Sequence, residues 1–194
     1  MIENHIRSIM DIKVGVSNHH VHLTREALDI LFGQGYELKI KNMLKQKGQF
    51  AAEEQVKIHK NGKTLDHIRI VGPCRSYTQV ELLEKDNDFF GINAPLRSSG
   101  DLKGSESVMI EGPNGIFMAT ESTIVSNRHI HMSADDLIKF GKSNGDIVTV
   151  KCENGVVMDN VHIKSDDSCV LEFHMNKDEA NDLEIESEMI INIC

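Results

Sequence analysis

The sequence lacks the features that mark several large classes of protein. Tryptophan is absent and aromatic residues make up only 5% of the 194 residues, which argues against a nucleic-acid surface built from stacked rings. The 21 Lys and Arg residues against 30 Asp and Glu residues give a formal charge of -9, which repels a phosphate backbone. No apolar run approaches the roughly 18 residues of a membrane-spanning helix, and no signal-peptide core follows a basic N-terminus. We therefore expect a cytoplasmic protein that binds neither nucleic acid nor a membrane.

Cysteine is also scarce. The four cysteines form no Cys-x-x-Cys pair, which excludes a zinc knuckle and a thioredoxin-like motif, and a disulfide scaffold is not expected in an intracellular chain of this length. None has the local signature of a catalytic nucleophile, so all are interpreted as ordinary buried or half-buried thiols: Cys74, Cys152, Cys169 and Cys194. Histidine, in contrast, occurs ten times and is the better source of chemistry.

An internal repeat contains half of these histidines. Residues 16–24 (VSNHHVHLT) recur as residues 125–133 (VSNRHIHMS), at an offset of 109 residues. Each copy is followed by a stretch compatible with a short helix, which a Ser or Thr precedes and a glycine ends. The expected caps are Thr24 and Gly33 in the first copy, and Ser133 and Gly141 in the second. Both copies therefore predict a strand followed by a short helix.

The rest of the chain has mostly β patterns. Alternating apolar segments flank three turns, at Asn61-Gly62, Asn114-Gly115 and Asn154-Gly155. Asn-Gly is the strongest short hairpin signal, because a type I′ turn needs positive φ at both central residues. No long helical period is present, and no low-complexity linker separates the halves. The sequence predicts a mainly β fold, with two small β-barrels and short capping helices that are related by the internal repeat.

The repeat carries a pair of histidines in each copy. In a strand, residues i and i+2 point to the same side, so His20 with His22 and His129 with His131 form two imidazole pairs. Core packing gives no reason for paired imidazoles in both copies, because burying polar rings without partners costs free energy. Each pair is therefore interpreted as part of a metal site, and nitrogen ligands combined with carboxylates suit Zn²⁺ best.

The sequence also offers candidates for a third metal ligand and for an anion-binding residue. Glu81 and His174 each end a strand-like run and are candidates for a third ligand, but sequence spacing does not assign them to a pair. Arg75 lies in the turn before the strand of Glu81, and its planar guanidinium matches a phosphate or a carboxylate. The alternative for Arg75 is a solvated surface arginine.

At this point the sequence resembles the phosphate propanoyltransferase family, the PduL-type phosphotransacylases associated with bacterial microcompartments. The resemblance runs in order over nearly the whole chain from about residue 13, so it does not rest on a single motif. The matching blocks are residues 14–23, 48–54, 69–75, 78–81, 94–102, 128–133, 144–146 and 171–176.

The resemblance implies a role for individual residues. One zinc ion would be held by His20, His22 and Glu81, and a second by His129, His131 and His174. Arg75 would bind the phosphate, and coenzyme A would contact Val16, Ser17, Asn18, Arg69 and Asn181. The family commonly has Arg where this chain has His19, whereas the second copy keeps it as Arg128.

The resemblance also implies how the chain is organised. Family members are similar to two fused β-barrels in which the N-terminal strand joins the C-terminal half. One barrel would then consist of residues 13–18 and 127–194, and the other of residues 19–126. Residues 1–12 would be an N-terminal extension, in which the spacing of Ile2, Ile6, Ile9 and Met10 predicts the apolar face of a short helix. A frayed or core-capping N-terminus is the simpler interpretation, and an encapsulation peptide, which family habit also suggests, is the alternative. Family habit further implies a homodimer inside a bacterial microcompartment, with shell or core proteins as partners.

The implied activity is a reversible, zinc-dependent transfer of a propanoyl or acetyl group between coenzyme A and phosphate, in microcompartment-linked degradation of the propanediol type. Two other functions stay open. A binuclear zinc thioester hydrolase would use the same ligands, with hydroxide attacking in place of phosphate. A non-enzymatic binding module would use zinc as a structural staple, but structural zinc normally has four protein ligands and only three are identifiable per site.

Overall fold

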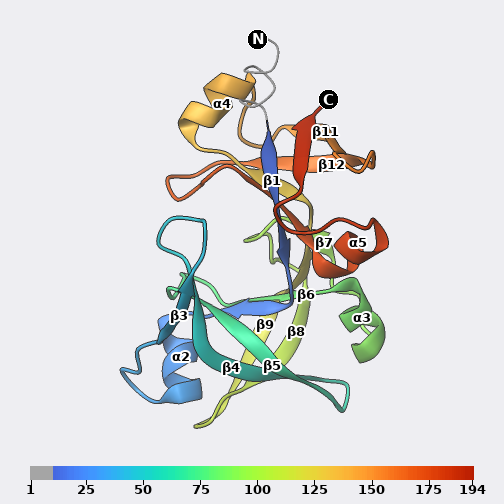
Figure 1. Ribbon diagram of the computed structural model, residues 1–194. Helices are drawn as coiled ribbons and strands as arrows, with labels where there is room; N and C mark the ends of the chain where they lie inside the picture. The colour runs from blue at the N-terminus through green and yellow to red at the C-terminus, as the bar shows by residue number, and fades with distance from the viewer. Residues whose placement is uncertain (1–10) are drawn as a thin grey trace. The chain divides into compact units, whose positions relative to one another are not determined.

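The computed structural model describes residues 11–194 and divides into two compact units (Figure 1). The first unit combines the N-terminal strand, which ends at Ser17, with Asn127–Cys194, and the second unit is Asn18–Ser126. Nearly all of the expected N-terminal extension, residues 1–12, lies outside the described residues. None of the helices in residues 11–194 is both long enough and apolar enough to span a bilayer.

A closed barrel of six strands forms the first unit, in the order β1-β13-β10-β12-β11-β14. Its strands are β1 (Ile12–Ser17), β10 (His129–His131), β11 (Ile147–Cys152), β12 (Val157–Lys164), β13 (Glu172–Asn176) and β14 (Ile190–Ile193). β1 lies parallel to β13 and antiparallel to β14, so the N-terminal strand closes the barrel of the C-terminal half (Figure 1). Helices α4 (Ala134–Phe140) and α5 (Lys177–Asp182) follow β10 and β13.

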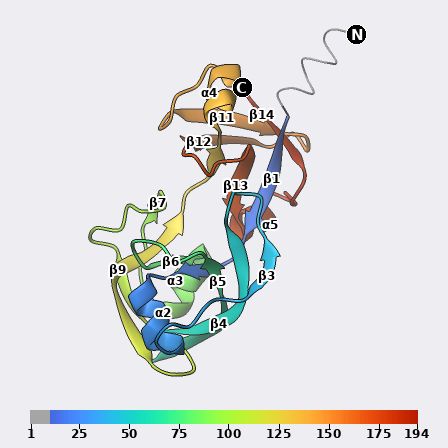
Figure 2. The ribbon, with the colours of Figure 1, turned by 90° about the vertical axis from the view of Figure 1, so that its left-hand side faces the viewer.

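The second unit is a ring of six strands in the order β4-β5-β2-β6-β9-β8, which closes because β8 pairs with both β4 and β9. The ring strands are β2 (His20–His22), β4 (Phe50–Lys60), β5 (Lys63–Gly72), β6 (Gln79–Leu82), β8 (Glu106–Glu111) and β9 (Ile116–Ser126). β3 (Ile40–Met43) and β7 (Leu96–Arg97) extend the sheet. Helices α2 (Arg25–Phe32) and α3 (Glu84–Phe90) follow β2 and β6. Figure 2 shows α2 against this barrel, where its buried face joins the core.

Both barrels have the same topology around the His-x-His strand. β10 lies parallel to β12 and antiparallel to β13, and β2 lies parallel to β5 and antiparallel to β6. In each barrel, a helix follows the strand that faces the His-x-His strand: α5 after β13 and α3 after β6. The predicted fold class is therefore confirmed, with two small barrels and short helices that are related by the repeat. The sequence did not predict α3 and α5.

Each barrel has its own apolar core, filled by alternate side chains of its strands. In β1, Ile12 and Val14 are fully buried, whereas Lys13 between them is exposed. Val21 and Ile130, the central residues of the two His-x-His strands, are also fully buried. Burial of such a side chain stabilises the fold by roughly 1.5–3 kcal/mol. The cores thereby hold the histidine strands in place.

The three predicted hairpins are present, but only one has the expected turn. Asn61 and Gly62 both have positive φ, 50° and 73°, as a type I′ turn requires. In the second turn, Gly115 is needed for space, because a Cβ there would lie 2.7 Å from the carbonyl oxygen of Ile30 in α2. In the third, the side chain of Asn154 accepts the backbone N–H of Val156 at 3.1 Å, which makes an Asx turn.

The helix caps predicted from the repeat are confirmed. α2 follows Thr24, whose hydroxyl accepts a first-turn N–H at 3.1 Å, and ends at Gly33 with φ 107°. α4 follows Ser133, which forms a capping box with Asp136, and ends at Gly141 with φ 60°. Because both helices directly follow a histidine strand, these caps set where each strand stops.

Replacing the cap of α4 should lower stability. Ser133→Ala removes the acceptor for a helix N–H, so the free energy of unfolding should fall by about 1 kcal/mol. Urea denaturation followed by circular dichroism measures this change. Ser133→Thr keeps the hydroxyl and serves as the control. An alanine variant as stable as the wild type would show that the cap contributes nothing.

Candidate functional site

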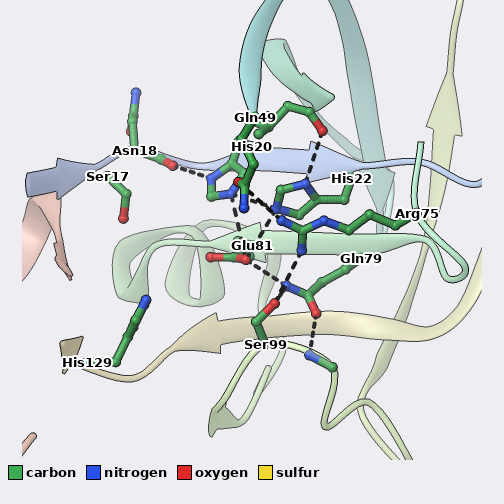
Figure 3. A network of polar contacts seen from close by, with 12 residues as sticks. Ser17, Asn18, His20, His22, Gln49, Arg75, Gln79, Glu81, Ser99 and His129 are labelled. Carbon is green, nitrogen blue, oxygen red and sulfur yellow. Dashed lines mark hydrogen bonds and ion pairs between the residues drawn. The ribbon is translucent and has the colours of Figure 1, made fainter. Parts of the chain in front are cut away.

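The first cluster of metal-ligand type lies in the second unit. His20 and His22 project from the same face of β2, and Glu81 of β6 lies directly opposite His20 in the antiparallel register. One ligand atom from each residue lies within 4.8 Å of the other two. The Nε2 atoms of both histidines lie 3.6 Å from Glu81 Oε1 and 3.2 Å from each other (Figure 3). Three donors thus converge on one point.

The backbone sets the tautomers of these two rings. His20 Nδ1 lies 2.9 Å from the Asn18 carbonyl oxygen, and His22 Nδ1 lies 3.0 Å from that of Val71. A carbonyl oxygen only accepts, so each Nδ1 carries the ring proton and each Nε2 presents a lone pair. Two lone pairs facing each other repel unless a cation lies between them. The arrangement therefore fits a bound metal ion.

The second cluster lies in the first unit and repeats this geometry. His129 and His131 project from β10, and His174 of β13 lies opposite His129. Ligand atoms from these three residues also lie within 4.8 Å of one another. The two Nε2 atoms of the pair are 3.1 Å apart, and His129 Nδ1 lies 2.9 Å from the Asn127 carbonyl oxygen. This site too fits an ion.

The outer contacts of the two sites differ in chemistry. His131 Nδ1 lies 3.4 Å from the sulfur of the buried Cys169, where the other unit uses a backbone carbonyl. His174 Nε2 lies 2.5 Å from Glu172 Oε2. The ring therefore donates its Nε2–H to the carboxylate, and the lone pair of the neutral ring is on Nδ1. Sequence reasoning did not single out Glu172, although it precedes His174 by two residues on the same strand face.

Burial controls the protonation of His22. The pKa of His22 is lowered from 6.5 to about 4, chiefly by desolvation; Glu81 opposes this shift, and the neighbouring His20 and Arg75 add to it. The ring is therefore neutral at ordinary pH and needs to lose no proton before it binds a metal ion.

Arg75 lies beside this cluster, in the loop between β5 and β6. Its backbone N–H donates to the Leu23 carbonyl at 2.8 Å, which fixes the loop against the segment that follows β2. Its guanidinium makes only long contacts, 3.4 Å to Ser99 Oγ and 3.5 Å to Gln49 Oε1. Among residues 11–194, no carboxylate forms an ion pair with Arg75. Its half-buried charge is thus available to an anion.

A buried amide connects Arg75 to the first cluster. Gln79 is fully buried and donates to Glu81 Oε1 at 2.6 Å and to Ser99 Oγ at 2.9 Å, while its own oxygen accepts the Gly100 N–H at 2.8 Å (Figure 3). Sequence reasoning missed Gln79 and Ser99. The available signal for Gln79 was its position two residues before Glu81, on the same strand face.

The predicted coenzyme A contacts are distributed over both units. Val16 and Ser17 end β1 and Asn181 is exposed on α5, all in the first unit. Asn18 and Arg69 belong to the second unit, where Arg69 lies in register with His20 on the neighbouring strand. The Arg69 guanidinium donates to the carbonyls of β4 at 2.8 and 2.9 Å. No ligand contact follows from these positions alone, and this set stays a prediction.

The structure explains the departure at His19. His19 Nδ1 lies 3.1 Å from Asp86 Oδ2, in the helix that follows β6. In the other barrel, Arg128 Nε lies 2.6 Å from Glu179 Oε1, in the helix that follows β13. The residue before each histidine pair therefore ties its strand to the equivalent helix, and His19 performs this role with a shorter side chain.

The buried His22 predicts an acid-sensitive fold for the protein stripped of metal. Between about pH 4 and 6.5 the unfolded chain binds a proton at this residue and the folded chain does not. The free energy of unfolding should therefore fall as the pH falls through this window, by an amount of the order of 3 kcal/mol. Urea denaturation at a series of pH values measures the slope. His22→Gln should flatten it and the exposed His67→Gln should not; an unchanged slope in His22→Gln would contradict the assignment.

Comparison with known proteins identifies the family. The family model for phosphate propanoyltransferase matches residues 13–186. A phosphate propanoyltransferase of Thermotoga maritima is 44% identical over 179 residues, which cover 91% of this chain and 85% of that protein. Proteins of the same name from Rhodopseudomonas palustris (42% identity, 94% and 82% covered) and Salmonella typhimurium (37% identity, 93% and 90% covered) are similarly alike. With matches that span most of each chain, this chain belongs to the phosphate propanoyltransferase family.

Proposed function

We propose that the protein transfers a propanoyl group reversibly between coenzyme A and inorganic phosphate, with two zinc ions bound per chain. Its family supports the reaction class, that of an acyltransferase. One observation carries the metal part of the proposal: two equivalent sets of three donors converge within 4.8 Å, and backbone carbonyls that accept from Nδ1 of His20, His22 and His129 turn the Nε2 atoms of these rings toward the other donors.

The donor sets suit zinc in catalytic sites. Each site offers three donors, all nitrogen in one site and two nitrogens with one carboxylate in the other, and three protein ligands are the number that catalytic zinc sites use. The proposed ligands are His20, His22 and Glu81 for one ion, and His129, His131 and His174 for the other. Zinc bound there supplies a Lewis acid that polarises the thioester carbonyl and stabilises the oxyanion formed from it.

Arg75 is proposed to bind the phosphate. Its guanidinium is a planar fork that pairs with two phosphate oxygens, and its protein contacts of 3.4 and 3.5 Å are weak enough to be exchanged for the substrate. Ser99 Oγ accepts hydrogen bonds from the guanidinium and from Gln79, and Gln79 also donates to Glu81, so a chain of hydrogen bonds links Arg75 to Glu81. Positioning of the anion replaces a bimolecular encounter with an oriented one.

The chain's own groups favour direct attack by phosphate. Ser99, the hydroxyl next to Arg75, contacts an amide and a guanidinium, and neither is a base that could activate it as a nucleophile. A phosphate oxygen therefore attacks the thioester carbon, the C–S bond breaks, and coenzyme A leaves as the thiolate. The same Arg75 site favours phosphate transfer over hydrolysis, because a hydrolase needs no anion-binding residue there.

The proposed transferase should release thiol from propanoyl-CoA only when phosphate is present, and chelation of the metal should abolish the release. Arg75→Ala should lower kcat/KM for phosphate on the order of 10²-fold, and Arg75→Lys should restore part of the loss because the charge returns without the fork. Thiol release monitored with a chromogenic disulfide measures both. Arg69→Ala, in the proposed coenzyme A site, should instead raise the KM for propanoyl-CoA.

Arg97 provides the matched control for this assay. Its guanidinium already donates to the Lys103 carbonyl at 2.6 Å and lies 3.5 Å from Asp101, so Arg97→Ala should leave phosphate use unchanged. Thiol release without phosphate would indicate the thioester hydrolase instead. Full activity after removal of all metal would rule out zinc dependence. Acetyl-CoA assayed in parallel tests whether the shorter acyl group is also a substrate.

The proposed cellular setting is a bacterial microcompartment that degrades a substrate such as propanediol, with a homodimer as the working form. Its support is the family resemblance and the helical spacing of Ile2, Ile6, Ile9 and Met10 in the sequence. Residues 1–12 fused to a fluorescent protein should therefore collect in microcompartments when shell proteins are co-expressed. The matched fusion with Ile2, Ile6 and Ile9 changed to Ser should stay diffuse. Equal distribution of the two fusions would refute the encapsulation role.

A further inference from the structure

Each His-x-His strand and its antiparallel partner form an array of four side chains on one sheet face. In both arrays, the third ligand lies opposite the first histidine of the pair, and one more residue lies opposite the second histidine. The arrays are His20, His22, Gln79 and Glu81 in the second unit, and His129, His131, Glu172 and His174 in the first. Since the two barrels have the same topology, the four positions correspond one to one.

The two arrays carry their carboxylate at different positions. In the second unit, Glu81 is the third ligand and the supporting residue is the neutral Gln79. In the first unit, the third ligand is the neutral His174 and the supporting residue is Glu172. A zinc ion held by three neutral imidazoles keeps its full double charge, which is costly to bury without a compensating anion. The carboxylate of the first unit therefore lies where that charge needs it.

We infer that Glu172 is a positioning residue of the first-unit metal site. Through its hydrogen bond to His174 it supplies the negative charge that Glu81 supplies as a direct ligand in the second unit. This inference rests on the proposed function, because it presupposes that both sites bind zinc. Glu172 acts through His174 and touches neither substrate nor reacting atoms.

The contact between Glu172 and His174 has the geometry that this role requires. Glu172 is only 5% exposed, and its Oε2 accepts the Nε2 proton of His174 at 2.5 Å. A carboxylate bonded to the far nitrogen of a metal-binding imidazole fixes the tautomer and the ring orientation, and makes the other nitrogen a stronger donor. His174 thus offers Nδ1 to the ion.

Gly15 provides the space for this pair. It lies in register with His174 on the parallel neighbour β1, and a Cβ at this position would lie 2.9 Å from Glu172 Oε1 and 3.0 Å from His174 Cδ2. Any larger residue would push the carboxylate and the ring from their positions. The barrel therefore keeps one strand position empty of side chain at the place where Glu172 supports His174.

A competition titration of the zinc-loaded protein with a chromophoric chelator tests the inference. The wild type should release two ions per chain. Glu172→Gln keeps the size of the side chain but removes its charge, and should lower the affinity for one ion by about 10- to 100-fold while the other is unchanged. In the His20→Ala background the substitution should weaken the remaining first-unit site, and in the His129→Ala background it should have no effect.

Glu54→Gln is the matched control. Glu54 is a buried carboxylate of the second unit that accepts hydrogen bonds from Tyr36 and from the Lys39 backbone. Neither of these partners belongs to a proposed metal site. Its substitution should leave both zinc affinities unchanged. Gly15→Ala alters no polar group, and should weaken the same ion as Glu172→Gln. It carries the test if Glu172→Gln fails to fold.

The outcomes separate the inference from the proposed function. Wild-type protein that binds fewer than two ions would overturn the proposed function itself. Two ions in the wild type, together with wild-type affinities for both in Glu172→Gln, would overturn only the role of Glu172. A variant that loses urea stability after metal removal, with equal weakening of both ions, would assign Glu172 a merely structural role and also overturn the inference.

Discussion

The antiparallel register beside each His-x-His strand is the constraint on which the rest of the structure's chemistry depends. It places Glu81 opposite His20, and His174 opposite His129. A slip of one residue would turn every side chain of the strand to the other face and would break up both clusters of three donors. Val21 and Ile130 prevent this slip, because each is fully buried in its barrel core and would become exposed. The apolar cores thereby hold the geometry of the polar sites.

The backbone contributes as much to these sites as the side chains do. In both copies of the repeat, the asparagine two residues before the first histidine accepts its Nδ1 proton at the same distance, 2.9 Å. The Nε2 atoms then face each other at 3.2 and 3.1 Å, an arrangement that an ion stabilises. An ion that binds the folded chain more tightly than the unfolded chain also stabilises the fold, so an ion bound at either cluster would add to the stability of its barrel.

Local features of the chain were predictable because they depend on neighbouring residues. The i, i+2 spacing of His20 and His22, the caps at Thr24 and Ser133, and the hairpin at Asn61-Gly62 all follow from rules that act within a few residues. Gln79, Ser99 and Glu172 were missed for the opposite reason. Ser99 contacts Arg75 from a separate loop, which no local pattern encodes. Gln79 and Glu172 lie two residues before Glu81 and His174 on the same strand faces, but this spacing gains a meaning only once the facing histidine strand shows what these faces surround.

The sequence by itself determined the barrel class, the duplication and the two histidine pairs, since periodicity and repetition are properties of the chain. Only the tertiary structure decided which partner each pair received and where each carboxylate lies. Glu81 and Glu172 are both acidic residues on short strands, and spacing alone does not show that Glu81 lies opposite the first histidine of its pair whereas Glu172 lies opposite the second. That difference arises from cross-strand register, and from the room left by Gly15 on a strand from the opposite end of the chain, because these contacts exist only once the barrels are closed.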